Sequence, residues 1–433
     1  MLYSFVRPFV TIFHNVFYRI HYRGLENIPM GKPVVFAPNH VNGFVDPIVI
    51  AIACKQKVRF FARSDVFNSS LKKRILNSLS VSPMYRIREG FAEVKKNEQA
   101  FEECKKLLAE NKSILIFPEG DCVQEKRIRK LKKGLARIVF YTEEAFNFEK
   151  DVLVVPVGLN YSEPTKFRSN LCVEFGKPIS AASYANSYKE NKAKAITDFT
   201  QEIEDSLKGA VVVQKYPEND DLFKQLCLLL KPKLLVDKGF EVDNVEQGYL
   251  MEKEIAAKIS NTQNVNPANI DSLKKACEAC LVELKKNNIQ DALQLFVPNT
   301  GMLNLIFHLF VCVLAVPLFT VAFLVNAPAY LISGWLTKRM VKDNVFVGSF
   351  ALNLGMIFWL VQYTVELLTI KSLLGNYNAL ICAMAIPILG MYLLFFTSYA
   401  KKVLRRLSAF SRVNTLDAIR AKHLTAVVEA YRK

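Results

Sequence analysis

The sequence has few charged residues for its length: 22% of its 433 residues are Asp, Glu, Lys or Arg, while 51% are hydrophobic. With only 17 glycines it lacks the composition of collagen, and its apolar content excludes intrinsic disorder. Internal repeats and low-complexity tracts are also absent. The length exceeds what one hydrophobic core normally supports, so we expect two or three folded units.

Cysteines are scattered and odd in number, nine in all, which excludes a small disulfide scaffold. The one close pair, Cys277 and Cys280, has neither a second pair nor a nearby histidine to complete a zinc site. The sequence therefore predicts a reducing compartment and no structural metal.

Acidic residues are in the minority, with 40 Asp and Glu against 57 Lys and Arg, which gives a net charge of +17. Such a charge favours anionic partners, namely nucleic acid, an anionic lipid surface or a phosphorylated substrate. The mean hydropathy of +0.15 favours the lipid partners. Because no helix-turn-helix, zinc or aromatic-interleaved motif accompanies the basic residues, nucleic acid is not an expected partner.

Residues 24–209 alternate short β-branched runs with helical stretches, which predicts an α/β domain with a mostly parallel sheet flanked by helices. Most of these runs end in a polar or proline-rich turn, and such turns bind ligands in open α/β sheets. The predicted strands are Val34–Phe36, Val58–Phe61, Ile114–Phe117, Val152–Val157 and Leu171–Phe175.

Two further parts of the chain are predicted to be helical. Residues 1–23 carry an apolar stripe interrupted by charges, which favours an interfacial amphipathic helix, with an ordinary core-packing helix as the alternative. Residues 210–300 predict a helical connecting domain without a recognisable catalytic group.

The composition changes abruptly after Pro298, and we expect a membrane domain over residues 301–400. Residues 302–336 are too long for one span and too short for two, which favours a re-entrant or broken hairpin. Two further stretches, 345–370 and 379–399, are each long enough to span a bilayer.

The distribution of basic residues favours a re-entrant first segment, because both flanking clusters then lie with the α/β domain on the cytoplasmic side. A single crossing would instead place Lys401 to Arg406 outside. Residues 401–433 form a basic tail, expected to be cytoplasmic. Gln362 and Glu366 lie one turn apart in the second stretch, where the carboxylate indicates either a function or snorkelling.

The most informative segment runs from Pro38 to Pro47 and contains His40 and Asp46 directly after a predicted strand. A histidine can accept a proton from a hydroxyl near neutral pH, and a nearby carboxylate can orient it. The structural alternatives are a hydrogen-bonded turn histidine and an aspartate that caps the following helix ahead of a proline.

Two other segments carry candidate binding residues. Glu119 and Gly120 end the Ile114–Phe117 run and precede a basic stretch, which could neutralise a phosphate or form only a solvated face. Arg86 and Arg88 would share one face of an extended chain and could grip a phosphate, or lie idle on the surface. A fourth segment, Val154 to Gly158, reads as a buried strand.

Together, in this order, the four segments resemble the glycerophospholipid acyltransferases, which include the glycerol-3-phosphate and lysophosphatidic acid acyltransferases. The resemblance covers about residues 24–180. It implies His40 as the general base, Asp46 as its orienting carboxylate, and a substrate-binding set of Asn39, Arg86, Arg88, Glu119 and Gly120.

The resemblance also implies direct attack on an acyl thioester, donated by coenzyme A or acyl carrier protein, without metal, other cofactor or covalent enzyme intermediate. The acceptor would be glycerol-3-phosphate or lysophosphatidic acid, in phospholipid biosynthesis at a membrane. One departure is that five residues separate His40 from Asp46, where the usual motif has four. Glycine in the pair Asn42-Gly43 could absorb the extra residue. The longer spacing resembles a membrane-anchored branch that includes fungal glycerol-3-phosphate acyltransferases.

Three other functions stay open at this point. The protein could acylate a lyso-aminolipid, remodel phospholipids by transacylation, or serve as a catalytically silent membrane scaffold in which His40 and Asp46 only brace a turn. Acyl-chain length, the donor and the glycerol position do not follow from the sequence.

Overall fold

The computed structural model describes residues 2–84, 97–298 and 301–432. The chain divides into two compact units. One comprises residues 1–213 together with 343–349, and the other comprises residues 214–342 together with 350–433. The first boundary lies close to the predicted end of the α/β domain at residue 209. The second unit holds the predicted tail and most of the predicted connecting and membrane regions, of which residues 210–213 and 343–349 belong to the first unit.

The first unit is built on a sheet of eight strands with the order β1-β7-β6-β2-β5-β3-β4, in which β8 pairs with β6. All pairs in this path are parallel except β6 with β7, and the pair of β6 with β8 is also antiparallel. The mostly parallel α/β fold is therefore confirmed. The strands are β1 (Tyr18–Arg23), β2 (Val34–Pro38), β3 (Val58–Arg63), β4 (Val81–Met84), β5 (Ser113–Leu115), β6 (Leu153–Tyr161), β7 (Ser169–Phe175) and β8 (Ile179–Ser180).

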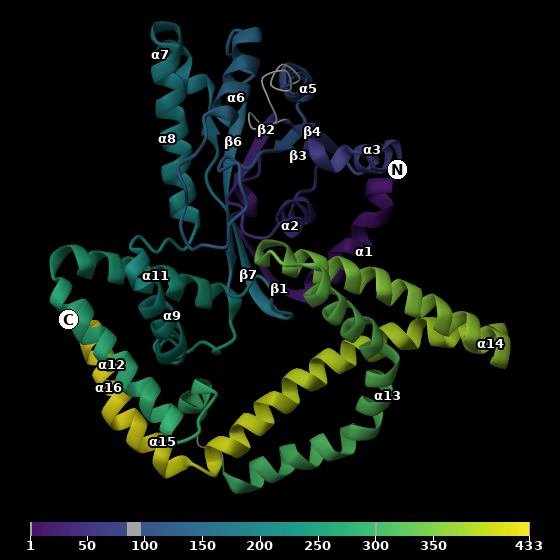
Figure 1. Ribbon diagram of the computed structural model, residues 1–433, viewed down its shortest axis with the longest axis vertical. Helices are drawn as coiled ribbons and strands as arrows, with labels where there is room; N and C mark the ends of the chain where they lie inside the picture. Colours follow the sequence, from purple (N-terminus) through teal and green to yellow (C-terminus); the bar gives the residue numbers. More distant parts are fainter. Residues whose placement is uncertain (1, 85–96, 299–300, 433) are drawn as a thin grey trace. The chain divides into compact units, whose positions relative to one another are not determined.

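Helices flank the sheet because the central strands are apolar on both faces and must be covered on both. On one face, α5, α6 and α8 share a core with β2, β5 and β6 that includes Phe140 and Phe199. Figure 1 shows α2 on the side of the sheet opposite α8. The helices of this unit are α1 (Leu2–Phe17), α2 (Val45–Ala53), α3 (Ser70–Ser78), α5 (Asn97–Ala109), α6 (Gly134–Ala145), α7 (Ala185–Glu190) and α8 (Lys192–Ala210).

The N-terminal helix is shorter than the predicted range of 1–23. It ends at Phe17, and Tyr18–Arg23 form the strand β1, because aromatic and β-branched residues alternate there with polar ones. One side of the helix packs against the unit: His14 is fully buried, and Arg7 donates to the carbonyl oxygens of Ile52 and Cys54. Ile12 stays exposed, so the interfacial role of this helix remains a prediction.

Among its described residues, the second unit contains helices joined by loops and no strand. The region predicted as a helical connecting domain forms α9 (Asp220–Leu229), α10 (Lys231–Asp237), α11 (Val245–Val265) and α12 (Pro267–Lys286). The C-terminal tail forms α15 (Val413–Ile419), a π-helical turn over Arg420–Leu424, and α16 (Thr425–Arg432). Helices α15 and α16 pack against α12, so the tail is part of a folded bundle.

Several bases of the predicted basic tail are engaged within this bundle. Arg405 binds Asp291 at 2.6 Å, Lys402 binds Asp243 at 3.1 Å, and Arg420 donates to the carbonyl oxygen of Leu295. Part of the tail's charge therefore holds the connecting region rather than facing an anionic surface.

Two helices, α13 (Met302–Met340) and α14 (Asn344–Phe410), are long and apolar enough to cross a membrane. Helix α14 is two helices joined at Gly375, where φ is 85°, and this break separates the two predicted spans. Helix α13 is a single helix with Pro317 and Pro328 inside it. The re-entrant or broken hairpin expected for residues 302–336 stays a prediction.

Candidate active site

The site lies at the carboxyl ends of β2, β5 and β6, where the sequence places its polar turns. Asn39 follows β2 directly and is buried. Its side-chain amide donates to the carbonyl oxygen of Leu159 at 3.1 Å, and its oxygen accepts from the Leu159 amide at 2.7 Å. Asn39 therefore links the end of β2 to β6 and holds the backbone position of the next residue, His40.

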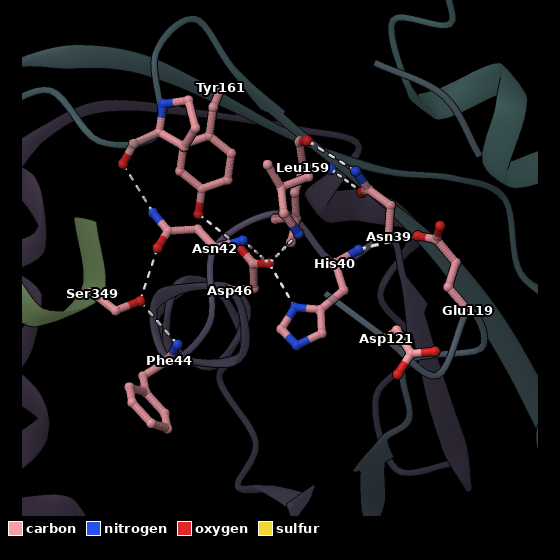
Figure 2. A network of polar contacts seen from close by, with 12 residues as sticks. Asn39, His40, Asn42, Phe44, Asp46, Glu119, Asp121, Leu159, Tyr161 and Ser349 are labelled. Atoms are coloured by element: carbon pink, nitrogen blue, oxygen red, sulfur yellow. Dashed lines mark hydrogen bonds and ion pairs between the residues drawn. The ribbon is translucent and has the colours of Figure 1, made fainter. Parts of the chain in front are cut away.

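His40 and Asp46 form a hydrogen-bonded pair, with His40 Nδ1 2.8 Å from Asp46 Oδ2 (Figure 2). Asp46 Oδ2 also accepts from the backbone amides of Val41 at 2.7 Å and Asn42 at 2.8 Å. Asp46 lies in the first turn of α2 rather than at the N-cap position, which Phe44 occupies. The capping alternative is therefore wrong, because the donors to this carboxylate belong to the loop before the helix.

Tyr161, at the end of β6, completes the shell around Asp46. Its hydroxyl donates to Asp46 Oδ1 at 2.7 Å, and burial together with the negative charge of Asp46 raises the pKa of Tyr161 well above its usual value. The hydroxyl thus stays protonated as a donor. Since three groups donate to Asp46 besides the imidazole, the carboxylate acts only as an acceptor, and His40 Nδ1 carries the proton between them.

The imidazole of His40 is held on its other sides as well. Its ring stacks on Phe117 with a centroid distance of 3.8 Å, and its backbone amide donates to Glu119 Oε1 at 3.2 Å. The His40 carbonyl oxygen accepts from the Val123 amide at 3.0 Å. The side chain keeps 17% of its exposure, and Figure 2 shows its second ring nitrogen pointing away from Asp46. That nitrogen is the one able to accept a proton from a bound hydroxyl.

Glu119 lies in the turn that follows β5 and is bonded on both sides. It is 5% exposed, and its Oε2 accepts from both the backbone amide and Nε of Arg129 at 3.2 Å. Gly120 follows with a φ of +78°, a left-handed conformation that favours glycine. The structure thus brings His40, Asp46, Asn39, Glu119 and Gly120 together. Arg86 and Arg88 lie outside the described residues.

Asn42 and Gly43 lie in a tight turn between His40 and Asp46, as expected, and the Val45 amide closes it by donating to the Asn42 carbonyl oxygen at 3.0 Å. Gly43 is not among the described residues with positive φ, so the backbone conformation of this turn does not itself require glycine. A Cβ at Gly43 would instead lie 2.7 Å from the ring of Phe346. Glycine is therefore needed for space.

Sequence reasoning missed Tyr161, Asn42 and Cys122. The ligand atoms of His40, Asp46 and Cys122 lie within 4.8 Å of one another, a spacing that could suit a metal ion. Both oxygens of Asp46 already accept hydrogen bonds, however. The pKa of the Cys122 thiol is raised, mainly by burial and secondly by the negative charge of Asp46. A metal would have to displace these donors, so the arrangement fits proton transfer better.

The site combines a buried carboxylate, an imidazole whose second nitrogen is directed away from that carboxylate, and a position at the carboxyl ends of parallel strands. This is an arrangement in which an imidazole can act as a general base. The family model described as "Acyltransferase" matches residues 19–160, which contain this site. This part of the chain belongs to the acyltransferase family.

Curated relatives match parts of the same region. Over 110 residues the chain is 34% identical to "Glycerol-3-phosphate O-acyltransferase 1" of Saccharomyces cerevisiae, covering 24% of this chain and 14% of the relative. It is 26% identical over 144 residues to a chloroplastic 1-acyl-sn-glycerol-3-phosphate acyltransferase of Arabidopsis thaliana, covering 33% and 36% respectively. The chain therefore spans only a minor part of each relative's length.

A solved structure, the 1-acyl-sn-glycerophosphate acyltransferase of Thermotoga maritima, aligns with 48% of this chain and 77% of its own. The identity is 17% and the TM-score 0.33.

Proposed function

We propose that the protein is a membrane-bound O-acyltransferase that moves a fatty acyl group from a thioester donor to a hydroxyl of glycerol-3-phosphate or lysophosphatidic acid. The observation that carries this proposal is the 2.8 Å contact between His40 Nδ1 and the buried Asp46, whose carboxylate three further donors hold in place. The names of the yeast and plant relatives support this acceptor class.

In the proposed reaction, His40 Nε2 accepts the proton of the acceptor hydroxyl as its oxygen attacks the thioester carbonyl. Asp46 stabilises the imidazolium that forms, through the Nδ1 hydrogen bond. The tetrahedral intermediate then collapses, the carbon–sulfur bond breaks, and the departing thiolate takes the proton back from His40. The products are the new ester and the free thiol, so the base is restored without a covalent enzyme intermediate.

A phosphate on the acceptor needs cations near His40. Arg129 is paired with Glu119, so its charge is already partly neutralised. We therefore assign the phosphate to Arg86 and Arg88, which follow β4 in the sequence. Asn39 and Glu119 are buried and bonded to protein groups, and their proposed contribution is to position His40 rather than to touch the acceptor.

The same proposal places the protein in a membrane as a multi-pass protein, with its catalytic unit on the cytoplasmic face. Two helices apolar enough to cross a bilayer support membrane association. The basic clusters 338–342 and 401–406 support the orientation, since such clusters favour the cytoplasmic side.

The test is acyl transfer by the detergent-purified protein, with glycerol-3-phosphate and lysophosphatidic acid offered separately and with both thioester donors. The histidine variant His40→Ala should lose activity by about 10² to 10⁴-fold while keeping the wild-type thermal transition. His21→Ala, which changes a partly buried histidine in β1, is the matched control and should retain activity. Equal rates for wild type and His40→Ala would refute the mechanism, and a well-folded wild type inactive with every pair would refute the substrate assignment.

A further inference from the structure

The segment Asp343–Ser349 belongs to the α/β unit, although it lies more than a hundred residues beyond the rest of that unit in the sequence. Its last residue, Ser349, is fully buried. The Ser349 hydroxyl donates to Asn42 Oδ1 at 2.8 Å and accepts from the Phe44 amide at 3.0 Å (Figure 2). One serine thus bonds two of the residues between His40 and Asp46.

Two glycines allow this close approach. A Cβ at Gly43 would lie 2.7 Å from the Phe346 ring, as noted above. A Cβ at Gly348 would lie 2.3 Å from the carbonyl oxygen of Pro164, 2.9 Å from the Tyr18 hydroxyl and 3.0 Å from Asn42 Nδ2. Gly43 in the loop and Gly348 in the segment 343–349 each lack a side chain where the other part of the unit packs. The two segments therefore fit closely together.

Residues 343–349 thus form a seat for the loop between His40 and Asp46, and the same residues also contact the chain that follows Glu119. Gln124 Nε2 donates to the carbonyl oxygen of Asn344 at 2.9 Å. The Asp343 carboxylate is close enough to Cys122 to contribute to the raised pKa of that thiol, after burial and the charge of Asp46. The segment thus contacts both the His40–Asp46 loop and the chain that follows Glu119.

Asn42 transmits the contact to the catalytic pair. Its backbone amide donates to Asp46 Oδ2, while its side chain is held by Ser349 and donates to the Tyr18 hydroxyl at 2.8 Å and to the Pro164 carbonyl at 3.1 Å. A shift of Asn42 would therefore move one of the donors that orient Asp46.

We propose that Ser349 is a positioning residue for the reaction, and that the first turns of α14 hold the His40–Asp46 loop in its catalytic geometry. This inference rests on the proposed function. Because α14 continues into a helix apolar enough to cross a membrane, the catalytic loop is seated on the start of a candidate membrane span.

The kinetic test uses the full-length protein and two variants. Ser349→Ala removes both hydrogen bonds without adding volume, and Gly348→Ala adds a Cβ where the Pro164 carbonyl lies. We expect kcat to fall about tenfold or more in each, with KM for both substrates within twofold of wild type. The controls are Ser333→Ala, a buried hydroxyl that donates only within its own helix, and Gly355→Ala, whose Cβ would meet Ser333 Oγ at an ordinary 3.5 Å.

A double-mutant cycle separates positioning from general stabilisation. Because Ser349 bonds both Asn42 and the Phe44 amide, the loss in Asn42→Ala/Ser349→Ala should be smaller than the product of the two single losses. Fully multiplicative losses would overturn transmission through Asn42, and a wild-type kcat in Ser349→Ala would overturn the proposal.

A second readout does not need activity. Alkylation of Cys122 by N-ethylmaleimide, followed by peptide mass spectrometry, should be several-fold faster in Ser349→Ala and Gly348→Ala than in wild type. Loss of the seat would separate the Asp343 carboxylate from the thiol and so weaken one of the charges that raise the pKa of Cys122. Cys227, another partly exposed thiol, serves as the internal reference. If wild type shows no acyl transfer but Cys122 is alkylated faster in both variants, the proposed function is refuted and the contact between residues 343–349 and the loop is supported. Unchanged labelling in both variants would overturn the seat itself.

Discussion

Replacing Asp46 by Asn removes the charge of the carboxylate while keeping its shape. An asparagine oxygen in the Oδ2 position would still accept from the amides of Val41 and Asn42 and from His40 Nδ1. Its NH₂ group would take the place of Oδ1 and face the Tyr161 hydroxyl, which can also accept a hydrogen bond. The change therefore tests whether the negative charge matters beyond the geometry.

The size of the effect follows from the separation of the pair. Unit charges 2.8 Å apart attract by about 6 kcal/mol at an effective dielectric constant of about 20, which sets an upper limit of about 10⁴-fold on the rate. Because the imidazolium is only partly formed in the transition state, we expect kcat to fall by about 10² to 10⁴-fold. Substrate affinity should change little, since Asp46 is buried beneath His40.

The assay compares kcat and KM of wild type and Asp46→Asn in detergent, with thermal unfolding of both. Asp151→Asn is the matched control: its carboxylate accepts from Ser180 Oγ at 2.5 Å in the same unit, away from the site, and its loss should leave the rate unchanged. A folded Asp46→Asn protein with a rate within threefold of wild type would show that charge on residue 46 has no part in the reaction.

Two further predictions concern stability. Burial lowers the pKa of His14 from its ordinary 6.5 to about 4, so the unfolded chain binds a proton that the folded chain does not, and about 3 kcal/mol of stability should be lost as the pH falls from 6.5 to 4. In denaturation series over this range, His14→Asn should show a correspondingly flatter pH dependence, and an unchanged slope would contradict the assignment. Gln362→Leu should cost about 1–2 kcal/mol in detergent, because the Gln362 amide binds both Ala329 N and Val325 O of α13; thermal unfolding checks this against Thr364→Val, and equal transitions would contradict it.

The strands and the His40–Asp46 pair were predictable because both depend on local sequence. Apolar runs such as Val34–Phe36 and Ile114–Phe117 must be buried on both faces, and a polar turn after a parallel strand must open at the carboxyl edge of the sheet. The exact limits were less accessible: Tyr18–Arg23 has a strand pattern, yet it follows a strong helical stripe without a break that marks the boundary.

Tyr161 could not be predicted from its neighbours because its role depends on register. It ends β6, and β6 pairs in parallel with β2, which places the Tyr161 hydroxyl over the turn that follows β2. Alternation along the strand indicates which side chains share a face, but only the pairing of the two strands sets how far Tyr161 reaches beyond Pro38.

The segment 343–349 explains the loop between His40 and Asp46 in a way that local sequence does not. Gly43 suggests a turn that needs glycine's conformational freedom, whereas the structure uses its missing side chain to admit Phe346. Ser349 lies 307 residues from Asn42, within a helix whose apolar composition predicts only a membrane span. A hydroxyl buried at the start of such a helix needs a partner, because an unpaired one would be costly. The pairing of Ser349 with Asn42 and Phe44 meets that need, so the bonds that satisfy the buried serine also hold the loop that carries His40 and Asp46.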